Sequence, residues 1–137
     1  MRLLIWHVDE FEAEPTERGR SPVADAEPRA VRVEDALVVF AAVEKKDEIE
    51  PEETAERAAA AIAQVAKQLG TRTVVVHSFA HLFVELSTPA IAQQVLMATQ
   101  ARLEADGYSV AQTAFGWFNK LAMRAKGHPL SRVARQV

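Results

Sequence analysis

The run from Ala36 to Val43 constrains the fold more than any other segment, because all eight of its residues are apolar. A strand exposed on one face alternates apolar and polar residues, so a continuously apolar run indicates a central strand covered on both faces. A helical pattern follows from Pro51 to Leu69, and a second strand follows that helix from Thr73 to His77. This order favours an α/β domain.

Two segments have the periodicity of helices. In the first, Pro51 to Leu69, the proline stands in the first turn and Gly70 follows the end. The second runs from Pro89 to Ala105, with Thr88 as N-cap and Gly107 beyond its end. Residues spaced by three and four give each helix one inner face. These are Ala55, Ala58, Ala59, Ile62, Val65, Ala66 and Leu69 in the first, and Ala92, Val95, Leu96, Thr99 and Leu103 in the second.

Three more strands are expected, over Arg2 to Val8, Tyr108 to Thr113 and Trp117 to Lys126. The stretch from Pro15 to Arg32 holds several prolines and charges, and we expect an extended or hairpin-like surface segment there. The 137 residues are thus expected to form one domain, an α/β fold with a mixed β-sheet and two main helices.

The composition limits both chemistry and location. With 0 Cys, the sequence excludes disulfides, thiolate metal sites and cysteine nucleophiles, and it favours a reducing intracellular environment. Charged or polar residues interrupt every apolar run that could cross a bilayer, and the first residues lack the pattern of a signal peptide. We therefore expect a cytoplasmic domain with no membrane partner.

Charge is distributed unevenly along the chain, whose formal net charge is −3. Residues 1–57 hold 16 acids and 8 bases, a net of −8, whereas residues 58–137 hold 3 acids and 8 bases, a net of +5. From Phe115 to Val137 there are five bases and no acid. The asymmetry suggests contact with a polyanion at the C-terminal end. The alternative, which composition alone favours, is a solvated strand and tail.

Two histidines, His77 and His81, stand four residues apart. On a helix this spacing could bind a metal ion, but His77 ends a predicted strand and His81 opens the next turn, so no metal site is predicted. We expect His77 to be a strand-end histidine bonded to the backbone. His81 follows the carboxyl end of a buried strand, where α/β sheets usually bind ligands. Its imidazole could hydrogen-bond a substrate, with a structural role equally open.

The second candidate site is the segment from Ala114 to Lys120, in which Gly116 stands among three aromatic residues. Glycine is unfavourable in a strand unless a backbone or a ligand must come close. Aromatic rings beside bases suit stacking on unpaired nucleotides, although a simple core role is the alternative. Strand alternation gives two faces, one with Phe118, Lys120, Ala122, Arg124 and Lys126, and the other with Trp117, Asn119, Leu121, Met123 and Ala125. The bases on the first face could form a phosphate track.

The segment from Lys126 to Leu130 breaks the last long strand, and His128 within it is expected to hydrogen-bond in a turn. The sequence contains no Ser-His-Asp order, Walker loop, dinucleotide fingerprint or closely paired carboxylates. None of these motifs therefore explains the candidate residues.

Taken together, the segments resemble the N-terminal editing domain of archaeal threonyl-tRNA synthetase, which is related to the D-aminoacyl-tRNA deacylases. The matching segments keep the same order over nearly the whole chain: Met1-Arg2-Leu3-Leu4 with His7 and Asp9, Val43-Glu44-Lys45, Phe79-Ala80-His81-Leu82 with Glu85-Leu86, Phe115-Gly116-Trp117, and Lys126-Gly127-His128-Pro129-Leu130. The resemblance implies a D-aminoacyl-tRNA deacylase-like fold, a homodimer, and hydrolysis of mischarged L-seryl-tRNA(Thr). It also implies that residues 1–137 are one editing domain, the N-terminal part of a larger synthetase.

The resemblance also implies which residues form the site. Catalytic roles fall to His81, Phe118 and Asn119. Substrate would be bound by Ala42, Val43, Ser78, Phe79, Ala80, Phe115, Gly116 and Trp117, and tRNA by Lys120, Arg124, Lys126 and Arg132. No metal and no cofactor is expected for editing, because ATP and zinc would belong to a separate synthetic domain.

Three residues depart from the pattern of the more familiar members. Asn119 stands where they have a lysine, Ser78 where they have a proline, and Arg132 where they have a glutamate. Lys120 cannot replace the lysine, because consecutive strand residues point to opposite faces. We therefore expect hydrolysis to rely on backbone groups of Val43 and of the loop after the next strand, with the neighbouring ribose hydroxyl orienting water.

Two other functions stay open. A free-standing D-aminoacyl-tRNA deacylase would cleave esters of D-amino acids. A non-catalytic appendage would bind acceptor-stem RNA with steep salt dependence, or dimerise, and cleave nothing; the missing lysine at Asn119 keeps this alternative open. The expected nucleic-acid partner is tRNA and not DNA.

Overall fold

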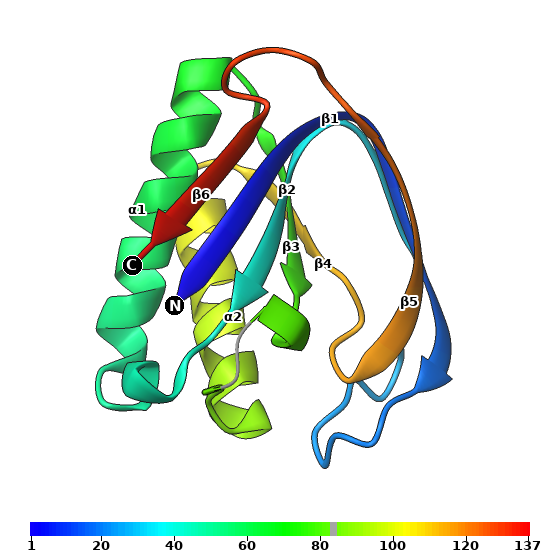
Figure 1. Ribbon diagram of the computed structural model, residues 1–137, viewed down its shortest axis with the longest axis vertical. Helices are drawn as coiled ribbons and strands as arrows, with labels where there is room; N and C mark the ends of the chain where they lie inside the picture. Colours follow the sequence, from blue (N-terminus) through cyan, green and yellow to red (C-terminus); the bar gives the residue numbers. More distant parts are fainter. Residues whose placement is uncertain (83–84) are drawn as a thin grey trace.

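The computed structural model describes residues 1–82 and 85–137. Within these residues the chain forms a mixed sheet of six strands with two α-helices, as the sequence predicts (Figure 1). The strands follow the order β4-β3-β2-β1-β5, and β6 also pairs with β1. In chain order the elements are β1 (Arg2–Arg18), β2 (Val31–Ala42), the 3-10 turn η1 (Lys45–Glu48), α1 (Pro51–Leu69), β3 (Thr73–Ser78), the 3-10 turn η2 (Ala80–Leu82), α2 (Pro89–Ala105), β4 (Ser109–Gln112), β5 (Trp117–Ala125) and β6 (Arg132–Gln136).

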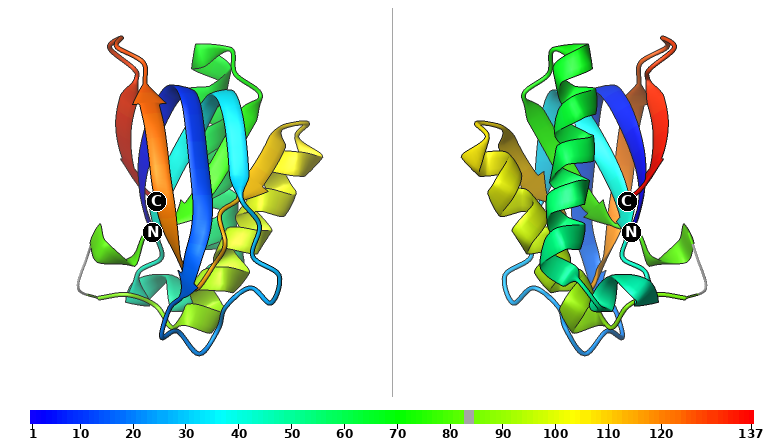
Figure 2. Two further views of the ribbon diagram at one scale, coloured as in Figure 1. Left: turned by 90° about the vertical axis from the view of Figure 1, so that its right-hand side faces the viewer. Right: turned by 90° about the vertical axis from the view of Figure 1, so that its left-hand side faces the viewer.

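Both helices cover the same face of the sheet (Figure 2, right). Their inner residues pack in one core with side chains of the central strands, namely Leu3, Ile5, Leu37, Val39, Val74 and Val76. The predicted inner faces are confirmed, except that Leu69 and Ala92 are only partly buried. α1 ends at Gly70, whose φ of 68° is the left-handed conformation typical of a helix C-cap. No helix in the described parts of the chain has both the length and the apolar character needed to cross a bilayer.

The face of the sheet opposite the helices is covered by bent parts of its own strands. The pairing of β1 with β2 skips Asp9 and Asp35, and Asp35 has a φ of 44°. Both strands bend at this point, and their far halves form, with β5, an arch over the inner strands (Figure 1). A second core fills the arch, made of Val8, Phe11, Ala13, Val31, Ala36, Val38 and Val75. The apolar run in β2 is therefore covered on both faces, which confirms the sequence prediction.

Strand β1 exchanges partners along its length. Its first residues pair with β6, and from Val8 onward it pairs with β5. The Val137 N–H donates to the Met1 carbonyl (3.0 Å), so the two ends of the chain lie side by side (Figure 1).

The sequence underestimates β1 and misses β6. β1 is predicted only to Val8, but it continues through Pro15 to Arg18. By Pro15 it has left β2, and its register with β5 shifts, so the missing N–H of the proline is tolerated. The predicted surface segment is therefore irregular only over residues 19–30. β6 gives no apolar pattern because Val133 is its one buried residue.

Candidate functional site

Two adjoining cavities open where β2 and β3 end, below the mouth of the arch. The narrower has a volume of about 200 Å³ and the wider about 440 Å³. Ser21, Ser78, Ala80 and Gly116 line both. Every residue predicted to be catalytic or to bind substrate lines at least one cavity: Ala42, Val43, Ser78, Ala80, Phe115 and Gly116 the narrower, and His81, Phe118, Asn119, Phe79 and Trp117 the wider. The structure thus brings together residues from three separate segments.

The narrower cavity has small apolar walls. Alanine side chains of β2 and α2 line it, together with Val43, Leu86, Pro89 and Phe115. Hydroxyls come from serines, among them Ser87. The Ser87 N–H donates to the Val43 carbonyl (3.0 Å), and the Phe79 N–H donates to the Ala41 carbonyl (2.9 Å). These bonds hold the backbone at Ser87 and at Phe79 against the end of β2. The walls of the narrower cavity are therefore positioned by backbone contacts.

The wider cavity has aromatic walls. Phe79 packs edge-on against Phe40 and against His81, with ring centroids 5.4 Å and 5.7 Å apart. Trp117 and Phe118 line the cavity from β5, and 58% of Phe118 is exposed. Exposed aromatic faces of this kind can stack on a planar ring such as a nucleobase.

Gly116 is confined by the chain itself. The sequence predicts a close approach by a backbone or a ligand, and the structure shows that a backbone makes it. Gly116 has a φ of 75°, and a Cβ there would lie 2.5 Å from the Val23 carbonyl oxygen and 2.7 Å from the Ala24 Cβ. The Gly19 N–H also donates to the Gly116 carbonyl (2.8 Å). The irregular segment 19–30 therefore packs directly behind this wall of both cavities.

Asp25 fastens that segment in place. Its carboxylate accepts from the Phe115 N–H (2.8 Å) and from Gln93 Nε2 of α2 (3.3 Å). Its carbonyl accepts from the Trp117 indole N–H (2.9 Å). Sequence reasoning missed Asp25, as it missed Arg20 and Ser21, which line the cavities. One carboxylate among the 16 acids of residues 1–57 carries no signal that separates it from the others.

Asn119 holds the turn that carries the aromatic residues. Its Nδ2 donates to the carbonyls of Ala114 (3.3 Å) and Trp117 (3.0 Å). Its Oδ1 is sealed from solvent and has no partner among the described residues. An amide does not titrate near neutral pH, so this side chain can position groups but cannot act as a general base.

His77 differs from its predicted role. The sequence predicts a bond to the backbone, but its Nδ1 lies 2.8 Å from the hydroxyl of Thr113 on the neighbouring chain segment after β4. Burial lowers the pKa of His77 to about 4, so the ring is neutral near pH 7. His77 lines the wider cavity and is buried, whereas His81 lines the same cavity and is exposed. The described residues contain no group of three or more His, Asp or Glu placed to hold a metal ion.

The predicted phosphate track is split by the structure. Lys120 is exposed on β5 near the cavities and has no ion pair among the described residues. Arg124 and Lys126 lie toward the other end, since the eight steps from Trp117 to Ala125 span roughly 26 Å of strand. Arg132 stacks over the ring of Trp6 at 5.0 Å. None of the four predicted tRNA-binding residues lines either cavity, although Lys120 stands in β5 between two residues that line the wider one, Asn119 and Leu121.

Lys126 fastens the crest of the arch. Its Nζ lies 2.7 Å from Asp9 Oδ1 and 3.2 Å from Asp35 Oδ1, the two residues at which β1 and β2 bend. The hydrogen bonds from Lys126 lower the pKa of both carboxyls. His7 joins this cluster, with Nε2 3.2 Å from Asp35 and Nδ1 2.9 Å from His128 Nε2.

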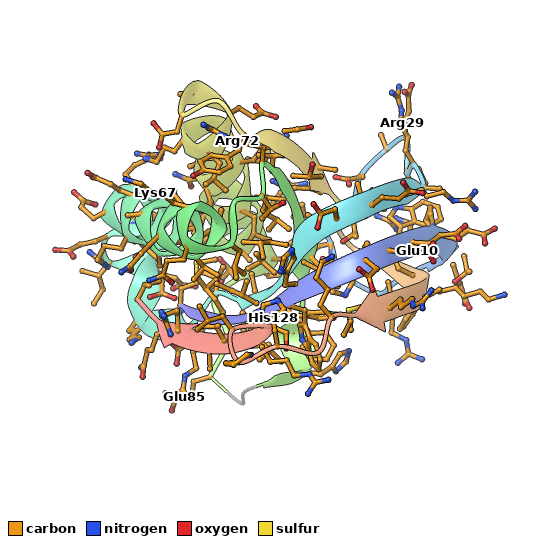
Figure 3. The ribbon with its side chains drawn as sticks, turned by 90° about the horizontal axis from the view of Figure 1, so that it is seen from above. Glu10, Arg29, Lys67, Arg72, Glu85 and His128 are labelled. Atoms are coloured by element: carbon orange, nitrogen blue, oxygen red, sulfur yellow. The ribbon has the colours of Figure 1, made fainter. Side chains whose placement is uncertain are left out.

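His128 lies in the turn between β5 and β6. Its Nδ1 accepts from the Leu130 N–H (3.3 Å), which confirms the predicted turn hydrogen bond. Figure 3 looks onto this end of the molecule and labels His128. Burial lowers the pKa of the neighbouring His7, against the opposite effect of Asp35. The histidine pair is thus a structural cluster at the end of the arch away from the cavities.

The fold and the cavities define a class of protein: an α/β domain with a small chamber beside an aromatic one where its parallel strands β2 and β3 end. The whole chain, residues 1–137, matches the family described as the archaea-specific editing domain of threonyl-tRNA synthetase, and the chain belongs to this family. The resemblance drawn from the sequence is therefore confirmed at the level of the family.

Individual relatives agree with this assignment. The threonine–tRNA ligase of Methanopyrus kandleri is 40% identical over 139 residues, and that of Thermococcus gammatolerans is 38% identical over 140 residues. Each match covers 100% of this chain and 22% of the relative, so the chain spans about a fifth of the length of these curated relatives. Among solved structures, the c-Myc DNA unwinding element binding protein shares the fold, with a TM-score of 0.66 and 10% identity over 100% of this chain and 99% of that chain. At that identity the likeness concerns the fold alone.

Proposed function

We propose that this chain hydrolyses the ester bond of mischarged L-seryl-tRNA(Thr), releasing serine and free tRNA. Membership of the editing-domain family supports the reaction class. The observation that supports it most is the pair of joined cavities, in which a chamber of about 200 Å³ adjoins an aromatic one of about 440 Å³. A seryl group fits the first and the terminal adenosine fits the second.

The mechanism needs no titrating side chain in the protein. An aminoacyl ester is already activated, so the site has mainly to orient water and to stabilise charge on the carbonyl oxygen. The first N–H groups of a 3-10 turn have no acceptor within it, so those near Ala80 and His81 are suited to that oxygen. The 2′-hydroxyl of the terminal ribose positions the water. His81, Phe118 and Asn119 fix the sugar and the amino acid.

Selectivity follows from the size of the narrower cavity. Threonine exceeds serine by one methyl group, and a binding pocket discriminates one such group by only about 1–3 kcal/mol. A second, hydrolytic site is therefore physically warranted in addition to the synthetic one. In the narrower cavity, between Ala92 and Phe115, the extra methyl of threonine clashes or displaces the attacking water.

The wider assignment is part of the same proposal. The chain acts as a cytoplasmic homodimer on tRNA(Thr) and forms the N-terminal part of a larger synthetase. Editing requires no cofactor, and ATP and zinc serve the separate synthetic domain. The unequal charge of the chain suits contact with RNA.

The test is a deacylation time course with seryl-, threonyl- and D-seryl-tRNA(Thr). We expect seryl-tRNA to be cleaved at least tenfold faster than threonyl-tRNA. A seryl-tRNA whose terminal ribose lacks the free 2′-hydroxyl should lose most of that rate. Fast cleavage of the D-seryl ester alone would identify a D-aminoacyl-tRNA deacylase instead, and binding without any cleavage would identify a non-catalytic appendage.

A further inference from the structure

His77 lines the wider cavity and has no part in the mechanism above. Only 7% of its surface is exposed, and its ring packs edge-on against Phe40 at a centroid distance of 5.0 Å. The centroid of the Phe79 ring lies 6.1 Å from that of His77, and Trp117 and Asn119 line the same cavity. The imidazole of His77 is thus a polar group beside aromatic rings in the lining of the wider cavity.

The hydrogen bond to Thr113 determines which ring nitrogen carries the proton. Thr113 is buried, and His77 Nδ1 is the one hydrogen-bond partner of its hydroxyl within residues 1–82 and 85–137. A buried hydroxyl that does not donate loses a hydrogen bond that water would have provided. The Thr113 O–H therefore donates to Nδ1, and the proton of the neutral ring lies on Nε2.

The Nε2–H group faces the cavity without a protein partner. Within the described residues it makes no hydrogen bond, and it is not one of the polar atoms sealed from solvent. Because burial lowers the pKa of His77 to about 4, the ring offers a donor without a positive charge near pH 7. Such a donor suits a neutral acceptor. A phosphate or carboxylate would instead favour the charged imidazolium, and an ammonium group has no lone pair to accept.

We propose that His77 donates a hydrogen bond from Nε2 to a ring nitrogen of the terminal adenine when the adenosine occupies the wider cavity. This inference rests on the proposed function, because it requires the terminal adenosine in that cavity. A base stacked on the aromatic walls turns its edge toward His77, and the edge of adenine carries the acceptors N1, N3 and N7. One of these three nitrogens is the expected acceptor.

The experiment uses seryl-adenosine in which a 3′-amide replaces the ester, so that it binds without being cleaved. Its 1-deaza, 3-deaza and 7-deaza forms each replace one ring acceptor by C–H. We expect one of the three to bind the wild-type chain about three- to tenfold more weakly than the parent compound, as the loss of one neutral hydrogen bond predicts. In His77→Phe, which keeps a ring without the donor, all four compounds should bind with similar affinity.

A second measurement tests the proton position without any variant at His77. Imidazole ¹⁵N spectra should show Nε2 protonated in the wild-type chain, and Thr113→Val should release that preference and weaken binding of the parent compound. Equal binding of all three deaza compounds to the wild-type chain overturns the proposal, as does discrimination that persists in His77→Phe. If seryl-tRNA is cleaved but the deaza compounds bind equally, only this inference fails. If the wild-type chain neither cleaves seryl-tRNA nor binds the amide, the proposed function fails with it.

Discussion

At the scale of single residues, Gly116 tolerates the least change. Its φ is 75°, and a Cβ at this position would lie only 2.5 Å from the Val23 carbonyl oxygen, which leaves no room for a side chain. Gly116→Ala should therefore lower the free energy of unfolding by about 3 kcal/mol, from strain and from displacement of the segment behind it. Urea denaturation of the wild-type chain and the variant measures this.

Gly127 provides the matched control for Gly116. A Cβ at Gly127 meets nothing within 4 Å, and its φ is not in the left-handed region. Gly127→Ala should change the free energy of unfolding by less than about 0.5 kcal/mol. Similar losses for the two alanine variants would show that the contact with Val23 does not determine the cost.

The residues of the site could largely be predicted, for a physical reason. Ala42, Ser78 and Trp117 stand at strand ends, and the ends of neighbouring strands meet at one edge of a sheet. Arg20 and Ser21 reach the same cavities from an irregular segment, where no periodicity reveals which side chains turn inward. The family resemblance therefore supplied cavity-lining residues at strand ends and in the short loops next to them, such as Val43 and Phe115, whereas the residues from segment 19–30 were missed.

At the scale of elements, the carboxylate of Asp25 helps to hold the segment 19–30, which forms a wall of the site, in addition to the backbone bond between Gly19 and Gly116. Asp25→Ala removes the acceptor of the Phe115 N–H and that of Gln93. We expect the free energy of unfolding to fall by about 2 kcal/mol, since hydrogen bonds to charged groups are among the stronger ones. Under the proposed function, KM for seryl-tRNA should also rise severalfold while kcat changes less. Denaturation and steady-state deacylation measure the two effects.

Gln93→Ala separates the two links made by Asp25. It removes only the contact with α2, at 3.3 Å, and leaves the bond to Phe115 intact. Its effect on KM should be within a factor of two. A KM in Asp25→Ala equal to that of the wild-type chain would mean that the segment keeps its position without this carboxylate.

The sequence predicted those helices and strands whose buried residues follow a regular pattern. α1 and α2 follow their patterns to the residue, because each buries one stripe against the sheet. β1 extends past its apolar start because its far half is specified by pairing with β5, a partner more than a hundred residues away. β6 is specified by pairing with β1 in the same manner. Long-range pairing of this kind leaves little trace in local sequence.

At the scale of the whole molecule, the arch divides the basic residues into two groups. At its crest, Lys126 pairs with both Asp9 and Asp35, and Arg124 lies 4.0 Å from Asp9. At its mouth, Arg20 and Lys120 have no ion pair within the described parts of the chain. Of the five bases in the C-terminal stretch, Arg124 and Lys126 therefore pair with acids at one end of the arch, whereas Lys120 at the other end has no ion pair within the described residues. If RNA enters the cavities, its phosphates meet the group at the mouth.

This division predicts which lysine contributes to tRNA binding. Lys120→Gln and Lys126→Gln remove the same charge from the same part of the sequence, so net charge is matched between them. Each phosphate contact contributes roughly 0.7–0.9 to the slope of log affinity against log salt concentration. We expect Lys120→Gln to lower the magnitude of that slope by the contribution of one phosphate contact. Lys126→Gln should leave the slope unchanged and should lower the free energy of unfolding, because Asp9 and Asp35 lose their partner. The measurement is filter binding of tRNA(Thr) between about 50 and 200 mM salt, a range over which such contacts are measurable. A reduced slope in Lys126→Gln alone would mean that RNA binds along the crest of the arch instead of at its mouth.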